Sequence, residues 1–267
     1  MMNGEEAGIS DGGCPGSLFG ESGNDDEAAC VNEADCAIAS ALHSAAGLDM
    51  SALPEHARRL YELSVNAFDA IVHAWMSELP ISAEIVRFGK KILAATADAP
   101  VPAGVTAARG KAEEAQRRAA DMAATDRGDP DVRIVQEAAY KVWHEIHRLT
   151  GLLRFSPNQD GVYTARCEPD YGILPALGPH FRERFGETSW IIIDEKRRLF
   201  LRCLQGQPPE CASLEKNAAS PKAAPDGEWE DLWRLYHTTI NNESRNNPDL
   251  QRQFMPRRYW KYLTELL

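Results

Sequence analysis

The first 50 of the 267 residues contain no lysine and no arginine, although they hold ten of the 40 aspartates and glutamates. The formal net charge of the chain is −11. An acidic protein repels nucleic acid. Because the excess acid is confined to the beginning of the chain, the rest is close to neutral. A basic surface that faces DNA is therefore not excluded.

Several functional signatures are also missing. The six cysteines form no CxxC pair, and neither the CxxxCxxC spacing of a radical-SAM cluster nor a GxxxxGK[ST] phosphate loop occurs. No apolar run approaches the ~20 residues of a membrane span. The chain begins with neither the basic nor the apolar region of a secretory signal. We expect a cytoplasmic protein with free thiols and no membrane segment.

What is present predicts one folded unit with polar additions. Residues 1–30 are rich in Gly, Ser, Asp and Glu without apolar periodicity, which predicts a disordered acidic tail. Residues 31–267 are expected to form a single α+β domain. Within it, Ala, Pro, Gly and charge dominate at about 97–128, which we interpret as a flexible insertion. A polar loop is expected at about 205–226.

Apolar periodicity indicates the order of helices and strands. Helices are predicted over 32–42, 54–79, 82–96, 129–149, 175–185, 228–241 and 249–266, the last of them bent at Pro256. Asp129-Pro130 is a typical helix start. The inner face of this helix is expected to consist of Val132, Val135, Ala139, Val142, Ile146 and Leu149. Leu232, Leu235, Tyr236 and Thr239 are expected to face inward. Strands are predicted over 152–155, 162–167, 190–194 and 199–204. These form two hairpins, so the expected fold is α+β, a small antiparallel sheet packed with several helices.

The most distinctive segment is Asn247–Glu265, which holds four Lys or Arg residues, four aromatic residues and only two acids. Rings interleaved with fixed positive charge suit stacking on bases and pairing with phosphates. The alternative is a terminal amphipathic helix that docks its rings on the core and leaves its charges in solvent. Three more basic residues, 196–198, lie in a predicted hairpin turn and would join the same surface only if the fold brings them there.

A set of short segments carries a family resemblance: Met76–Pro80, Glu145–Arg148, Gly151–Phe155, Asp160–Tyr163, Glu168–Pro175, Pro179–Phe181, Arg184–Phe185, Trp190–Arg197 and Asp249–Glu265. They resemble a bacterial family known as domain of unknown function 4130, and the similarity extends over 54–96 and 129–267. The resemblance implies a role in DNA repair beside a radical-SAM protein or a uracil-DNA glycosylase domain. It assigns no reaction, cofactor or residue role.

Three residues are candidates for catalysis: His147, Asp170 and His180. An imidazole beside a carboxylate can transfer protons near neutral pH, and Arg154 nearby can bind a phosphate. The alternative is a buried polar network that pins a helix to the sheet. The candidates for DNA binding are Arg148, Arg154, Lys196, Arg197, Arg198, Arg252, Arg257, Arg258, Tyr259, Trp260 and Lys261.

Two metal-dependent hypotheses are weaker. His144 and His147 are three residues apart, which breaks the HExxH spacing of a zinc helix. Asp170 followed by Asp194 and Lys196 resembles a nuclease signature, but Lys196 is expected in a turn rather than on the strand face that this chemistry needs. We expect no metal site.

Together these observations predict an accessory protein that binds DNA or a repair enzyme. The first alternative is an enzyme that acts on a DNA base or phosphate with a His/Asp site. The second is a protein–protein adaptor without DNA contact.

Overall fold

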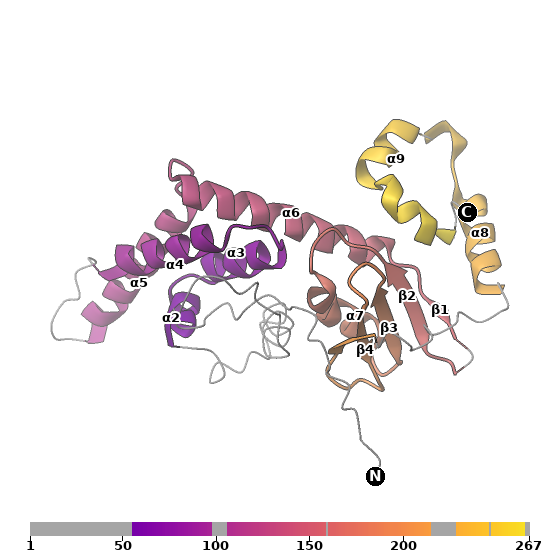
Figure 1. Ribbon diagram of the computed structural model, residues 1–267, viewed down its shortest axis with the longest axis horizontal. Helices are drawn as coiled ribbons and strands as arrows, with labels where there is room; N and C mark the ends of the chain where they lie inside the picture. Colours follow the sequence, from indigo (N-terminus) through magenta and orange to yellow (C-terminus); the bar gives the residue numbers. More distant parts are fainter. Residues whose placement is uncertain (1–54, 98–105, 159, 215–227, 246, 265–267) are drawn as a thin grey trace, which may run out of the picture.

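The computed structural model describes residues 55–97, 106–158, 160–214, 228–245 and 247–264. The predicted tail at 1–30 and helix at 32–42 lie outside the described residues. Figure 1 shows a long helix, α6, that runs across the molecule from a group of helices to a sheet. The α+β prediction is confirmed. None of the helices in the described part of the chain has the length and apolar character of a membrane span.

The helix predicted over 54–79 is two helices in the structure, α2 (Glu55–Leu63) and α3 (Val65–Met76). Ser64 separates them because its extended backbone and its side chain cap α3, with Oγ accepting from the amide of Ala67 at 3.1 Å. Its hydroxyl also donates to Asp121. A local capping preference thus overrides a continuous apolar pattern.

Part of the predicted insertion at 97–128 is helix α5 (Thr106–Thr125), which packs against α4 (Ser82–Ala97). Ala120 and Ala124 of α5 belong to the core. Each methyl buries little area, but small side chains let the helices approach closely, so an alanine-rich face suffices for packing.

Helix α6 (Pro130–Leu152) begins where the sequence predicts, because Asp129 accepts hydrogen bonds from the amides of Asp131 and Val132. The predicted inner face is confirmed, since all of its members are buried: Val132, Val135, Ala139, Val142, Ile146 and Leu149. The helix continues through Gly151, where the sequence predicted its end.

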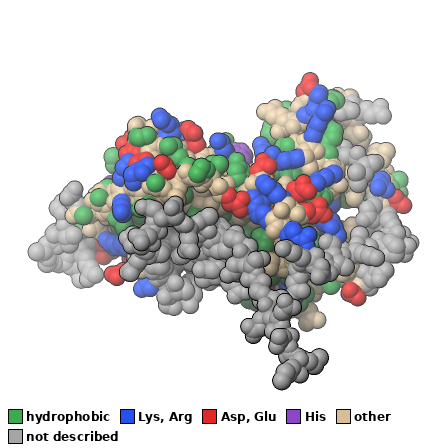
Figure 2. Space-filling model, in the orientation of Figure 1, with side chains coloured by type: hydrophobic (Ala, Val, Ile, Leu, Met, Phe, Trp, Pro, Cys, Tyr) green, Lys and Arg blue, Asp and Glu red, His purple; other side chains and the backbone are tan. Residues whose placement is uncertain are grey.

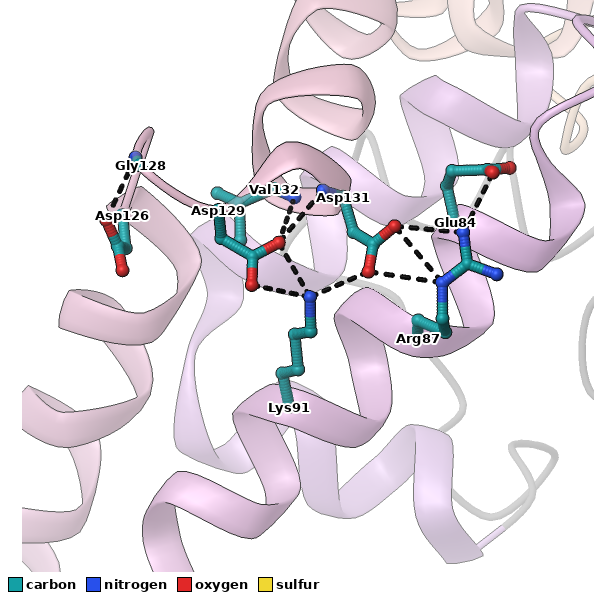
Figure 3. Close-up of polar contacts among 8 residues, drawn as sticks. All are labelled: Glu84, Arg87, Lys91, Asp126, Gly128, Asp129, Asp131 and Val132. Carbon is teal, nitrogen blue, oxygen red and sulfur yellow. Dashed lines mark hydrogen bonds and ion pairs between the residues drawn. The ribbon is translucent and has the colours of Figure 1, made fainter.

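An ion network joins the start of α6 to α4 (Figure 3). Lys91 reaches both Asp129 and Asp131, at 2.5 and 2.6 Å, and Arg87 lies 2.9 Å from Asp131. Hydrogen bonds from Arg87, and next from Lys91, lower the pKa of Asp131 to about 2. The network holds the N-terminal end of α6 against α4.

The sheet has five strands in chain order. Its strands are β1 (Ser156–Pro157), β2 (Tyr163–Cys167), β3 (Trp190–Asp194), β4 (Leu199–Cys203) and β5 (Glu210–Ser213). All neighbours are antiparallel except β2 and β3, which are parallel. The short helices η2 (Leu174–Leu177) and α7 (Gly178–Phe185) make the crossover that a parallel pair requires. Ala165, Ile192 and Leu201 lie side by side across the sheet and are buried.

One strand prediction and one loop prediction need correction. The strand predicted over 152–155 is wrong, because α6 occupies Leu152 and β1 is only Ser156–Pro157. Pro157 has no amide proton, which limits the ladder on this edge. The polar loop predicted over 205–226 contains strand β5, and residues 215–227 lie outside the described residues.

The C-terminal part comprises α8 (Glu228–Ile240), η3 (Glu243–Arg245), α9 (Pro248–Phe254) and η4 (Arg257–Tyr262), with the predicted interruption at Pro256. The predicted inward face of α8 is wrong. Leu232, Leu235 and Tyr236 are 57%, 65% and 52% exposed. The contacts between α8 and other segments include the following: Arg234 Nε donates to the Thr264 carbonyl at 3.1 Å, and the Arg154 guanidinium lies 5.1 Å from the ring of Trp233.

Candidate functional site

A buried carboxylate, Glu145, lies where α6, the loop after β2 and the C-terminus meet. It is 1% exposed. Its two oxygens accept the amides of Asp170 and Tyr171 at 2.9 and 3.0 Å. Arg258 donates to it at 2.9 Å, and the hydroxyl of Tyr259 donates to the same oxygen. A buried charge requires such partners, so Glu145 anchors three segments at one point.

Arg258 and Tyr259 make further contacts around Glu145. The second arm of the Arg258 guanidinium lies 2.5 Å from the carboxylate of Asp170, and the group also sits 4.7 Å from the Tyr259 ring centre. Burial, and next the hydrogen bond to Glu145, raise the pKa of Tyr259. The phenol therefore stays protonated and remains a donor at neutral pH.

The next two contacts extend the attachment along η4. Lys261 lies 2.7 Å from Glu168, and Tyr262 donates to Glu195 at 2.8 Å. Glu195 also accepts a hydrogen bond from Arg166 of β2 at 2.9 Å. We call the four η4 residues that bind the domain's own carboxylates the C-terminal clasp: Arg258, Tyr259, Lys261 and Tyr262.

Arg197 in the β3–β4 turn also binds groups of the protein itself. Its guanidinium binds Glu78, with the shorter contact at 2.5 Å, and Asp194 at 3.1 Å. It also donates to the carbonyls of Pro169 and Asp170 at 3.0 and 2.9 Å. Arg197 therefore ties the loop after α3 to the sheet rather than extending into solvent.

The nuclease alternative finds no geometric support. Asp194 is fully buried, and desolvation raises the pKa of its carboxyl. Lys196 lies in the turn and donates to the Asp170 carbonyl at 3.1 Å. No cluster of three or more His, Cys, Asp or Glu suited to a metal occurs within the described ranges.

The remaining basic candidates lie nearer to solvent. Arg257 is exposed and sits 5.7 Å from the ring of Trp260, whose indole N–H donates to the Met255 carbonyl at 2.8 Å. In the part of the chain that the structure describes, no carboxylate pairs with Arg257. Of all the C-terminal candidates, this Arg–Trp pair is the one most open to an external ligand.

Four other candidates are dispersed. Arg252 pairs with Asp249 within α9, and Arg154 lies 5.1 Å from the ring of Trp233 on α8. Arg148 is half-buried on α6, and Arg198 is exposed in the β3–β4 turn with a φ of 55°.

The basic candidates thus divide into two sets. The inward set binds groups around the Glu145 anchor and the β3–β4 turn and consists of Lys196, Arg197, Arg258 and Lys261. The outward set lies outside these contacts and consists of Arg148, Arg154, Arg198, Arg252 and Arg257. Figure 2 shows the result on one face, where basic and acidic side chains intermingle over the sheet half of the molecule.

Two of the three catalytic candidates share a pocket between α6 and α7, with a volume of about 470 Å³. The residues that line this α6–α7 pocket are Trp143, Ile146, His147, Thr150, Pro179, His180 and Glu183. Partial burial, with the charge of Arg184 second, lowers the pKa of His180, which favours its neutral form at pH 7. Asp170 does not line the pocket, because it belongs to the Glu145 anchor.

The role of Glu145 was not predicted from the sequence, although the sequence contains a signal for it. Glu145 directly precedes Ile146 and follows Val142 by three positions, so the predicted inner face of the helix already contained a carboxylate. Such a residue demands buried donors. The helical pattern does not reveal that Arg258 and Tyr259 are among those donors.

These features define an α+β protein in which the C-terminal segment is clasped onto a long central helix. The family described as domain of unknown function (DUF4130) matches residues 113–265, more than half of the chain, and the protein belongs to this family. No curated protein and no solved structure matches it.

Proposed function

We propose that the protein is a cytoplasmic accessory factor in DNA repair or modification that binds DNA for a partner enzyme. The partner class, a radical-SAM protein or a uracil-DNA glycosylase, follows from the family resemblance described above. Free thiols at Cys167, Cys203 and Cys211 suit a reducing compartment.

The observation behind the proposal is the exposed Arg257 beside the half-buried ring of Trp260. Its immediate neighbour, Arg258, is neutralised by Glu145 and Asp170, whereas Arg257 keeps its charge available beside a ring. A guanidinium and an aromatic face at one place serve a phosphate and a base together. The DNA contact is therefore assigned to the outward set and not to the clasp.

A salt titration tests the proposal. Binding of fluorescent single-stranded and duplex DNA is measured by anisotropy for the wild type and for Arg257→Ala. Loss of one phosphate contact lowers the slope of log K against log salt by about 0.7 for single strands or 0.9 for duplex. The matched control is Arg133→Ala, which removes an exposed arginine near the N-terminal end of α6, away from the C-terminal segment. An unchanged slope for Arg257→Ala removes it from the contact, and no binding at low salt ends the DNA proposal.

A second function, an enzyme acting on a DNA base or phosphate, is favoured by the presence of His147 and His180 in one pocket. A neutral His180 can accept a proton. Damaged oligonucleotides are incubated with the wild type and with His180→Ala, and products are followed under single-turnover conditions. Turnover by the wild type that falls by about 100-fold or more in the variant supports this function. Equal turnover contradicts it.

A further inference from the structure

The α6–α7 pocket has two walls of different character. Its α6 residues recur at helical spacing, so they form one helix face. On that face the rings of Trp143 and His147 are nearly parallel, at 4°, with centroids 5.5 Å apart. Trp143 is 47% exposed, a large apolar ring left open to solvent. Exposed rings that line a hollow are stacking surfaces for a planar ligand.

The opposite wall supplies a hydrogen-bond acceptor. Glu183 of α7 is exposed, and within the described residues its carboxylate forms no hydrogen bond or ion pair. A second acceptor lies on the α6 wall, where the hydroxyl of Thr150 donates to the His147 carbonyl at 2.7 Å and keeps its lone pairs as acceptors. A carboxylate repels a phosphate but accepts N–H donors, so the polar chemistry suits an amine-bearing heterocycle.

A cation lies near the carboxylate acceptor on α7. Arg184 directly follows Glu183, is exposed, and its charge acts on His180 of the pocket. A ligand with a planar base in the pocket and a phosphate beside it would meet an acceptor in the pocket and positive charge from α7.

We propose that the α6–α7 pocket binds one unpaired, amine-bearing base of DNA, stacked on Trp143 and hydrogen-bonded to Glu183. The inference rests on the proposed DNA-binding function and specifies where a base is held. Stacking of a single base explains why a tryptophan is exposed there, and the carboxylate selects cytosine, adenine or guanine over thymine through their exocyclic amines.

The test separates the base from the backbone. Anisotropy measures binding to oligonucleotides of about twelve nucleotides, within the usual site size of single-strand binders. One strand is all deoxycytidine, one is all thymidine, and one is abasic with the same number of phosphates. Trp143→Ala is compared with Tyr140→Ala as a control. Tyr140 is an exposed ring about one turn earlier on α6, and it does not line the pocket. Circular dichroism verifies that both variants fold.

We expect Trp143→Ala to weaken binding of the deoxycytidine strand by about tenfold, the contribution of one stacked base, with abasic binding unchanged. Trp143→Phe should recover part of the loss, and Tyr140→Ala should bind as the wild type does. Glu183→Ala should abolish the preference for deoxycytidine over thymidine.

Two results overturn the inference in distinguishable ways. If Trp143→Ala binds all three strands as the wild type does, the pocket is not the base site, while DNA binding itself stands. If the wild type binds no strand, the pocket inference and the proposed function fail together.

Discussion

The hydroxyl of Tyr259 donates a hydrogen bond to the buried carboxylate of Glu145, across 114 positions of sequence. This contact changes the meaning of the basic and aromatic C-terminus. Its charges and rings look suited to DNA as a group, yet half of the group holds the protein to itself. A contact with nucleic acid is then left to the neighbours that point outward, above all Arg257.

Replacing Tyr259 by phenylalanine removes that hydrogen bond while keeping the ring. Tyr259 is 2% exposed, so no water replaces the lost donor on Glu145. The free energy of unfolding should fall by about 1–3 kcal/mol, the cost of leaving a buried group less satisfied. Urea unfolding measures it. Tyr140→Phe, at a solvent-exposed tyrosine of α6, should unfold like the wild type; an equal loss in both variants would contradict the assignment.

Arg197→Ala should be more damaging. The side chain of Arg197 is 13% exposed and that of its partner Asp194 is 0% exposed, so the substitution leaves a carboxylate buried without its cation. We expect a loss of about 3–5 kcal/mol in urea unfolding, typical of breaking a buried ion pair. Adding Asp194→Asn should recover part of that loss, because the unpaired charge is gone. If the double variant is no more stable than Arg197→Ala, the pairing is not the cause.

The ion network of Figure 3 predicts a dependence on acid. Because the pKa of Asp131 is lowered to about 2 in the folded state from 3.8, its contribution is complete above pH 3.8 and is lost as the pH falls toward 2. A double-mutant cycle of Asp131→Asn with Arg87→Gln should therefore show coupling at pH 7 that disappears near pH 2. Coupling of equal size at both pH values would contradict this account.

Local patterns in the sequence predicted most elements. The start of α6 at Asp129, its inner face and the strand Trp190–Asp194 follow from capping and periodicity, which act over a few residues. What could not be predicted was which elements meet. The parallel pairing of β2 with β3 and the exposure of α8 depend on tertiary packing, to which a periodic pattern is blind.

The same limit applies to the candidate site. Arg257 and Arg258 are adjacent and chemically identical, and only the fold decides that Arg258 pairs with Glu145 and Asp170 while Arg257 faces solvent beside Trp260. His147 and His180 were predicted as partners and share a pocket, whereas Asp170 is taken by Arg258. The choice of partner for a charge is set by distant segments of the chain.

Glu145 anchors the C-terminal clasp, and amide hydrogen exchange of Glu145→Gln tests this role most directly. A glutamine places an amide donor among groups that all donate, so exchange within 247–264 should accelerate, including the Tyr259 and Leu263 amides that bond to Pro256 and Trp260. Glu137→Gln, at an exposed position on the same helix, should exchange as the wild type does. Unchanged exchange of the clasp in Glu145→Gln would contradict the account.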